Sequence, residues 1–269
     1  MVGGYGVYGV YGNLPFKYMA VNSIQEVLSK LEEIIRQAKE EQSSIGYFAA
    51  LYYRMTLAVS EAIQRGEFEN GSRMEQMDVV FARRYFNALE SWQSGQATTL
   101  SWKIAFEATQ NPNLTVMQHL LLGMNAHINL DLGIAAAAIR QKDAIFGMRK
   151  DFMHINGIIE RLTNKTQEQL GAIWLPFTWL DRLFRSEDEG WIGFSIRIAR
   201  GTAWKSAQLL AFAPDRNAEK QIIQQIDQHT AFLAGRLEKP GFWLGILLSW
   251  MRRSERGSIS DKIDVLEKG

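Results

Sequence analysis

The sequence contains no cysteine, and this absence excludes disulfide bonds, thiolate metal ligands and cysteine nucleophiles. Any metal in this protein must therefore be held by nitrogen and oxygen atoms. The absence is also compatible with a reducing compartment, and we expect the protein to be cytoplasmic.

An excess of charge of one sign is lacking as well, because 30 lysine and arginine residues are balanced by 29 aspartate and glutamate residues, which gives a formal net charge of +1. Electrostatically driven binding of nucleic acid needs a basic patch or stripe. The sequence has none, so we expect no nucleic acid partner and instead a small-molecule substrate, apolar or anionic.

Long apolar runs are also missing. A helix that spans a bilayer needs about 18 to 20 apolar residues, and the closest stretch, residues 240–253, is shorter and ends in Arg252 and Arg253. This stretch suits a terminal packing helix or an interfacial helix. The strongest membrane association that we expect is therefore peripheral contact through residues 240–253. The N-terminus lacks the basic start and continuous apolar segment of a signal peptide.

Proline is scarce, with five residues in 269, and no run of alternating β-branched residues predicts a strand. Helical periodicity is present instead: from Ile24 to Ile35 the apolar residues recur at intervals of three and four after a capping residue, Asn22 or Ser23. Later segments repeat the pattern. We predict an all-α, single-domain bundle of about eight to ten helices over residues 22–253. Residues 1–21, rich in glycine and tyrosine, should form a flexible arm, and residues 254–269 a polar, frayed tail.

Two histidines, two asparagines and an aspartate interrupt the apolar run QHLLLGMNAHINLDLGIAAAAI, residues 118–139. Buried polar groups cost free energy unless they are paired, so a helix that carries five of them predicts a site. In one helix with about 100° per residue, His119, Gly123, His127 and Asp131 share a face about 120° wide. Gly123 would leave room there for a ligand.

Asn125 and Asn129 point to the other side of the same helix, at roughly 240° and 280° from His119. We expect both to be structural and to make buried hydrogen bonds to the backbone of a neighbouring element. The helix therefore has two polar faces with different roles.

His127 and Asp131 are one helical turn apart, a spacing that lets them bind the same ion or hydrogen-bond each other. Two interpretations stay open. The pair is part of a functional site, or Asp131 fixes the tautomer of His127 and the pair ties the helix into the core. His119 on the same side favours the site.

Asp151 and His154 lie one turn apart in the next predicted helix, in DFMHINGII. A short link at residues 141–143 would make the two helices antiparallel neighbours, which is how bundles assemble internal sites. We therefore predict that the hairpin of residues 114–160 supplies most of the site. Its catalytic residues would be His127, Asp131 and Asp151, and its metal ligands His119, His127, Asp131, Asp151 and His154.

Arg200 lies among small residues in RIARGTAWK, four positions before Trp204. A guanidinium group matches carboxylate or phosphate in a bidentate way, so we predict that Arg200 contributes a catalytic or anion-binding cation. The alternative is a solvated surface arginine, which is the common case.

The segments WKIAFEA, HLLLGMNAHINLDL, DFMHIN and RGTAW together resemble the bacterial family known as domain of unknown function 5995, from about Tyr47 to about Leu210. NAHINLDL is the specific part. The resemblance implies a helical domain but brings no activity, and the residues that match the family motif are His119, Asn125, His127, Asn129, Asp131 and Asp151. A more distant likeness exists to the zinc-dependent phospholipase C and P1 nuclease group. The chain lacks the further histidines with which that group holds three zinc ions, so no mechanism is carried over.

Two classes of function follow. The first is a metal-dependent enzyme with zinc, iron or manganese, and hydrolysis is favoured over oxygenation because the paired-glutamate pattern with ExxH is absent. The second is a non-catalytic helical module that binds an apolar ligand or a protein partner, with the His/Asn/Asp cluster as an internal network.

Overall fold

The computed structural model describes residues 21–159, 162 and 191–268, and every regular element within these ranges is helical. The predicted all-α class is therefore confirmed, whereas the predicted arm lies almost entirely outside the described residues. Two elements are not α-helical: a π-helix, η1 (Asn125–Asp131), and a 3₁₀ helix, η2 (Lys142–Met148). An α-helix at residues 149–159 follows η2. The other α-helices are α1 (Ile24–Glu40), α2 (Ile45–Gln64), α3 (Gly71–Gln93), α4 (Leu100–Ala108), α5 (Val116–Met124), α6 (Leu132–Ile139), α9 (Trp191–Ala211), α10 (Arg216–Glu238), α11 (Phe242–Ser254) and α12 (Ile259–Lys268).

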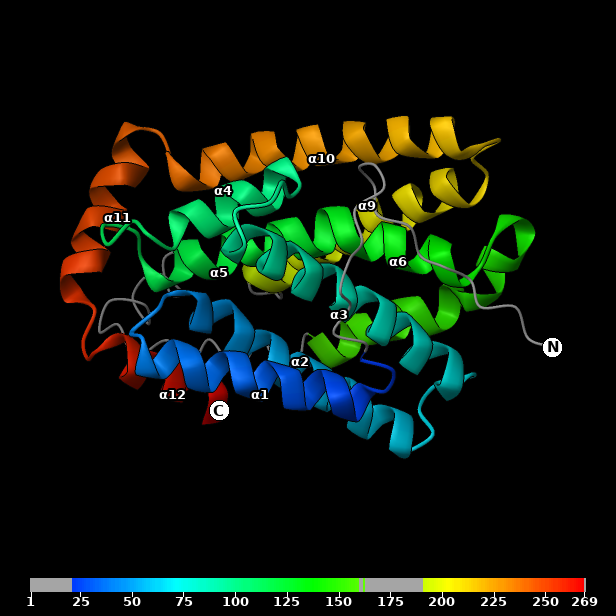
Figure 1. Ribbon diagram of the computed structural model, residues 1–269, viewed down its shortest axis with the longest axis horizontal. Coiled ribbons are helices and arrows are strands. Elements are labelled where there is room, and N and C mark those ends of the chain that lie inside the picture. Colours follow the sequence, from blue (N-terminus) through cyan, green and yellow to red (C-terminus); the bar gives the residue numbers. More distant parts are fainter. Residues whose placement is uncertain (1–20, 160–161, 163–190, 269) are drawn as a thin grey trace.

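One continuous helix, α5–η1–α6, runs through the middle of the bundle from Val116 to Ile139 (Figure 1). The long helix α10 lies along one side and packs on α4 and η1, while α1 and α12 lie along the opposite side and pack on α2. Helices α3 and α9 pack against α6, the second half of the central helix. The polar motif of the sequence thus lies at the centre of the fold.

The central helix is long and apolar enough to span a bilayer by length and composition, so the expectation that no segment has this character is wrong here. The structure buries 72% of its most apolar window among the other helices. A helix that is apolar on all sides is typical of the centre of a bundle, because neighbours cover every face.

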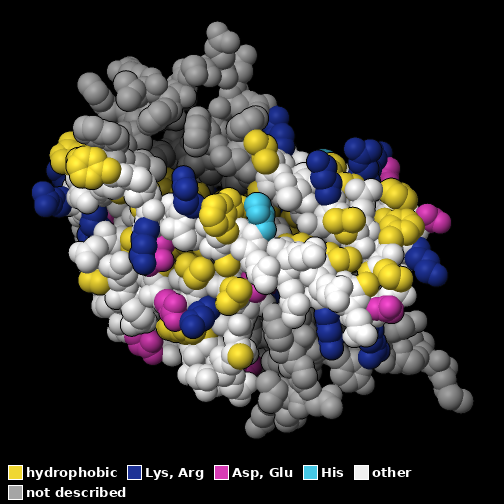
Figure 2. Space-filling model, turned by 90° about the horizontal axis from the view of Figure 1, so that it is seen from above, with side chains coloured by type: hydrophobic (Ala, Val, Ile, Leu, Met, Phe, Trp, Pro, Cys, Tyr) yellow, Lys and Arg dark blue, Asp and Glu magenta, His cyan; other side chains and the backbone are white. Residues whose placement is uncertain are grey.

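On the face of the molecule seen from above, apolar side chains are interspersed with lysine and arginine side chains (Figure 2). Phe232 on α10 and Leu209 on α9 are among the exposed large apolar residues. Single exposed apolar residues of this kind are normal on protein surfaces.

Carboxylates from distant segments cap three helix N-termini. Asp151 accepts hydrogen bonds from two backbone N–H groups just before α3 (2.7 and 3.1 Å), and Asp227 accepts two at the start of α4 (2.8 and 3.0 Å). Glu255 accepts one at the start of α5 (2.8 Å). Helix N-termini have unpaired N–H groups and a partial positive charge, so these carboxylates fix where the helices begin relative to one another.

The predicted frayed tail is instead a packed helix, α12. Ile259, Ile263 and Leu266 follow the spacing i, i+4, i+7, and Ile263 and Leu266 are fully buried in the apolar core. A Cβ atom at Gly46 of α2 would lie 2.3 Å from Ile263, so this glycine allows α12 to approach. The segment is mostly polar, and this composition conceals the short amphipathic pattern in the sequence.

Gly123 also serves helix packing. A Cβ atom there would lie 2.5 Å from Cγ of Phe48, so the ring of Phe48 fills the space that we expected to hold a ligand. That expectation is wrong.

Replacing Gly123 with alanine should lower the free energy of unfolding by about 1 to 3 kcal/mol, because the new methyl group overlaps the Phe48 ring in a packed core. Urea unfolding would measure the change. Gly201→Ala is the matched control, since Gly201 is also helical and has no neighbouring atom within 4 Å of its Cβ position. That variant should be unchanged or up to about 1 kcal/mol more stable. Equal effects in the two variants would contradict the packing role of Gly123.

Candidate functional site

Asp131 is fully buried, and its carboxylate is surrounded by three side-chain donors from three helical elements. Nε of Arg84 donates to Oδ1 (2.6 Å), Nε1 of Trp102 donates to Oδ2 (2.8 Å), and Nδ1 of His127 lies 3.2 Å from Oδ2. Burial by itself would raise the pKa of Asp131, but the charge of Arg84 and the bonds from His127 and Trp102 outweigh burial and hold the pKa below its usual value. The carboxylate is therefore ionised.

His127 is held neutral beside this carboxylate. Burial lowers the pKa of its imidazole, the bond and charge of Asp131 oppose that effect, and the charge of Arg84 adds to it. Because an ionised carboxylate can only accept, Nδ1 carries the proton and Nε2 keeps its lone pair. No described residue hydrogen-bonds to Nε2. The ring stacks on Phe81 (centroids 3.6 Å apart, planes at 8°) and meets the edge of Tyr52 (4.5 Å, 72°).

His127 and Asp131 belong to the π-helical segment, which a reading at a uniform 100° per residue did not anticipate. Nδ2 of Asn125 donates to the carbonyl of Thr230 on α10 (2.9 Å), as predicted for a structural asparagine. Asn129 donates to Oδ1 of Asn125 (2.9 Å) and is half-buried, so its expected bond to a backbone group is not observed. Short π-helical segments are frequent at functional sites.

A cavity of about 120 Å³ borders His127. Its wall comes from α2, α3, the central helix, the helix that begins at residue 149, and α9, and it is largely apolar, with Met55, Met77, Met117 and Met124 among the lining residues. Two buried polar atoms of lining residues have no hydrogen-bond partner among the described residues: Oδ2 of Asp78 and Nε2 of His127. A buried polar atom without a partner costs about 1 to 3 kcal/mol, so two of them beside one cavity make this cavity the candidate site.

Asp78 is the residue of this cavity that sequence reasoning missed. It is buried on the apolar face of α3 beside Met77, and burial followed by the negative charge of Glu75 raises its pKa to about 7. The available signal was a carboxylate at a core position of the pattern Met74, Met77, Asp78, Phe81. At neutral pH this group can either donate or accept a hydrogen bond.

Arg200 also lines the cavity, and it is 3% exposed, so the interpretation as a solvated surface arginine is wrong. Its Nε and Nη2 donate to Oδ1 of Asn156 and to the carbonyl of Phe152, and the guanidinium lies 4.7 Å from the centre of the Phe152 ring. Burial lowers its pKa to about 9, which leaves it protonated at neutral pH. No carboxylate among the described residues forms an ion pair with it, and the buried charge is therefore available to an anion.

The remaining predicted metal ligands are not brought to His127 and Asp131. Asp151 pairs with Arg73 (2.6 Å) and caps α3, and His154 lies near Glu67 (3.3 Å) with 41% of its side chain exposed. His119 is eight residues from His127, or about 12 Å along the helix axis, and it borders other pockets. The sequence prediction used the angular positions of His119 and His127 around the helix axis and did not include their separation along that axis.

Within the described ranges no group of three or more histidine, aspartate and glutamate side chains could hold a metal ion. The donor set at His127 and Asp131 also does not fit a divalent metal, because Arg84 and Trp102 occupy the carboxylate oxygens.

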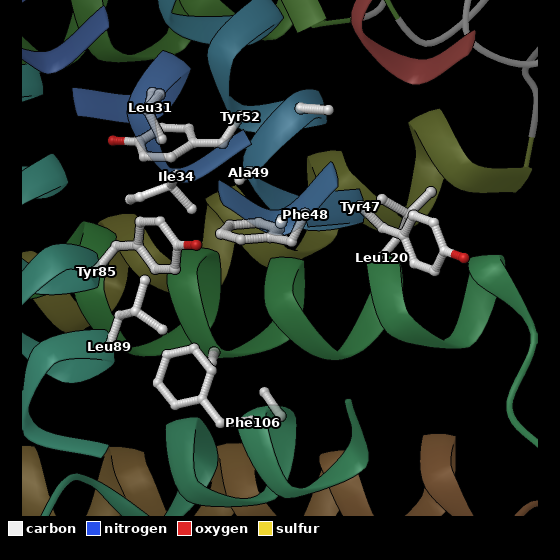
Figure 3. Packing of buried hydrophobic residues seen from close by; sticks show 14 of the residues in the cluster. Leu31, Ile34, Tyr47, Phe48, Ala49, Tyr52, Tyr85, Leu89, Phe106 and Leu120 are labelled. Atoms are coloured by element: carbon white, nitrogen blue, oxygen red, sulfur yellow. The ribbon is translucent and has the colours of Figure 1, made fainter. Parts of the chain in front are cut away.

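Figure 3 shows part of the packing of buried apolar residues around α2. Phe48 lies beside Tyr52 and Tyr85, whereas Tyr47 lies beside Leu120 with its hydroxyl oxygen directed away from that group. Phe48 contacts the ring of His127 (5.7 Å) and Tyr47 that of His119 (5.7 Å), so consecutive residues of α2 face the two environments.

Comparison with known proteins gives one match. The family model described as "Family of unknown function (DUF5995)" matches residues 24–240, which is most of the chain. No curated protein and no solved structure matches the sequence.

Asp78→Asn should make the protein more stable at pH 8 but not at pH 4. The pKa of Asp78 is raised from 3.8 to about 7, so the unfolded chain loses its proton first as the pH rises. Stability that is present below pH 3.8 is therefore lost progressively up to about pH 7, by up to about 4 kcal/mol. Asparagine mimics the protonated carboxyl group and removes this loss.

Urea unfolding of wild type and Asp78→Asn at pH 4 to 8 would measure the difference. Asp143→Asn, the same change at an exposed position, controls for the loss of a carboxylate. Parallel stability curves for wild type and Asp78→Asn would contradict the account.

Proposed function

The chain belongs to the DUF5995 family of unknown function, and we propose that it binds a small apolar molecule that carries an acidic group. The molecule occupies the cavity beside His127. The observation that carries this proposal is the combination of an apolar wall with buried polar groups that lack partners among the described residues, and with Arg200, which forms no ion pair with a described carboxylate.

The size and composition of the cavity favour a compact apolar body. An engineered apolar cavity of about 150 Å³ accepts benzene, so a volume of about 120 Å³ suits one ring or a short branched chain. The four methionines in the wall can adjust to a ligand because their side chains are flexible and polarisable.

Arg200 supports the acidic group. Among the described residues the guanidinium of Arg200 has only neutral acceptors as partners, so they do not compensate its charge in a region of low dielectric constant. Its bonds to described residues use Nε and Nη2, so Nη1 is left to bind a carboxylate. A carboxylate from the ligand would complete the missing ion pair.

His127 and Asp78 support a second polar group on the ligand. Nε2 of His127 can only accept a hydrogen bond, and Asp78 with a pKa of about 7 can donate one in its neutral form. A hydroxyl group both donates and accepts, and would satisfy the two residues together.

Catalysis is the second candidate, and the pairing of His127 with Asp131 favours it. A neutral imidazole whose Nδ1–H is held by a carboxylate has Nε2 ready to take a proton from water or a hydroxyl group. In hydrolysis His127 would act as general base and Asp131 would position it, without a metal ion. Turnover of a small aryl ester that is lost in His127→Gln would distinguish an enzyme from a binding protein.

Benzoate should bind the purified protein more tightly than benzyl alcohol or toluene, three probes with the same ring and different polar groups. Binding would be measured at pH 7 by titration calorimetry and as a rise in the midpoint of thermal unfolding. Arg200→Gln should weaken benzoate binding by about tenfold or more, since it removes a charge-assisted hydrogen bond, and should leave toluene unaffected.

Arg197→Gln is the matched control, because Arg197 lies one turn earlier on α9 and is exposed. It should behave as wild type. The proposal would be wrong if benzoate bound no better than toluene, or if both arginine variants bound benzoate as wild type does. The comparison of probes on wild type stays informative even if Arg200→Gln is poorly folded.

A further inference from the structure

A second cavity lies at the end of the bundle where the loops α1–α2 and α4–α5 meet α11 and α12, and it differs from the first in character. Its volume is about 360 Å³, and it shares no lining residue with the cavity beside His127. Polar and charged side chains make up most of its wall, among them Ser44, His119, Arg252, Glu255 and Lys262.

The charges in this wall are unevenly paired, and those of Lys262 and Glu255 are buried while Arg252 is partly exposed. Lys262 is 4% exposed, and its Nζ donates to Oε2 of Glu255 (2.9 Å), while Nη1 of Arg252 lies 3.5 Å from the same oxygen. Oε1 of Glu255 accepts the backbone N–H of Val116. Two cations thus share one oxygen of a single carboxylate, and Glu41, the other acidic lining residue, is exposed at the rim.

Helix ends add to the positive character. The first turns of α2 and α5 both border the cavity, and helix N-termini carry a partial positive charge. At His119, burial and then the charges of Arg252 and Lys262 lower the pKa to about 4.

His119 provides an independent sign of a ligand. It is 93% buried, being 7% exposed, and its Nδ1 has no hydrogen-bond partner among the described residues. The ring of Tyr47 packs against it at 5.7 Å and fixes its position in the wall. A buried nitrogen without a partner beside a polar cavity is satisfied when a ligand occupies that cavity.

We propose that this cavity binds a small oxyanion, held by Arg252 and Lys262 and hydrogen-bonded by Nδ1 of His119. The proposal is independent of the ligand cavity beside His127. Arg252 and Lys262 belong to α11 and α12, beyond residue 240, where the family match ends, whereas His119 lies within the matched region. The cationic half of the site therefore comes from the two C-terminal helices.

The histidine ring signals in a two-dimensional proton–carbon NMR spectrum test the proposal directly, since the chain has only four histidines. Inorganic phosphate and acetate, each added to the whole protein at constant ionic strength, serve as probes, and they distinguish a phosphate site from a carboxylate site. We expect one of them to shift the His119 signal saturably, with a dissociation constant on the order of 1 mM. The bound anion should also raise the pKa of His119, because it favours the charged imidazolium.

Arg252→Gln should weaken this binding about tenfold, and Arg253→Gln, the same change at the next and exposed position, should leave it as in wild type. His119→Gln should abolish the rise in thermal stability that the anion produces. The proposal is overturned if neither probe shifts the His119 signal saturably, or if Arg252→Gln and Arg253→Gln respond alike.

Discussion

The buried carboxylate of Asp131 is the constraint on which the centre of this structure depends. An ionised group with no exposed surface is tolerated only when its hydrogen bonds and charge are satisfied. Arg84 from α3, Trp102 from α4 and His127 from η1 meet this need together, so the carboxylate fixes three elements relative to one another. The same bonds determine the tautomer of His127, which lines the cavity and whose Nε2 has no hydrogen-bond partner among the described residues.

Around this satisfied core, three buried groups line one cavity. Asp78 lies in an apolar helix face, and among the described residues Arg200 forms no ion pair and Nε2 of His127 has no hydrogen-bond partner. Each of these features lowers stability, and a group that is retained at such a cost is typical of a functional site. His127 thus belongs both to the structural network around Asp131 and to the proposed ligand site.

The sequence predicted the features that depend on local periodicity and chemistry. The helical class, the pairing of His127 with Asp131, and the hydrogen bond from Asn125 to another helix follow from spacing and from the cost of burying polar groups. What depends on three-dimensional distance could not be predicted. His119 shares a direction with His127 but lies about 12 Å along the axis, and Asp151 is used to cap α3 because that helix happens to begin beside it.

Other errors arose from assuming ideal or average behaviour. A uniform α-helix was assumed where η1 is π-helical, and the polar composition of residues 254–269 concealed the few apolar residues that anchor α12. Asp78 was passed over although it interrupts an apolar stripe, the same kind of signal that identified Asp131. Only packing distinguishes a glycine that makes room for a ligand from one that makes room for the Phe48 ring.

The state of the His127 ring tests this account most directly. Nitrogen-15 NMR of the imidazole reports which nitrogen carries the proton and at what pH the ring becomes charged. The account predicts a neutral ring with the proton on Nδ1 and an unprotonated Nε2 at pH 7, and a pKa below that of a free histidine. It also predicts a change in the Nε2 signal when a hydroxylated acid fills the cavity. A ring protonated on Nε2, or one that titrates near pH 6.5 as a solvated histidine does, would contradict it.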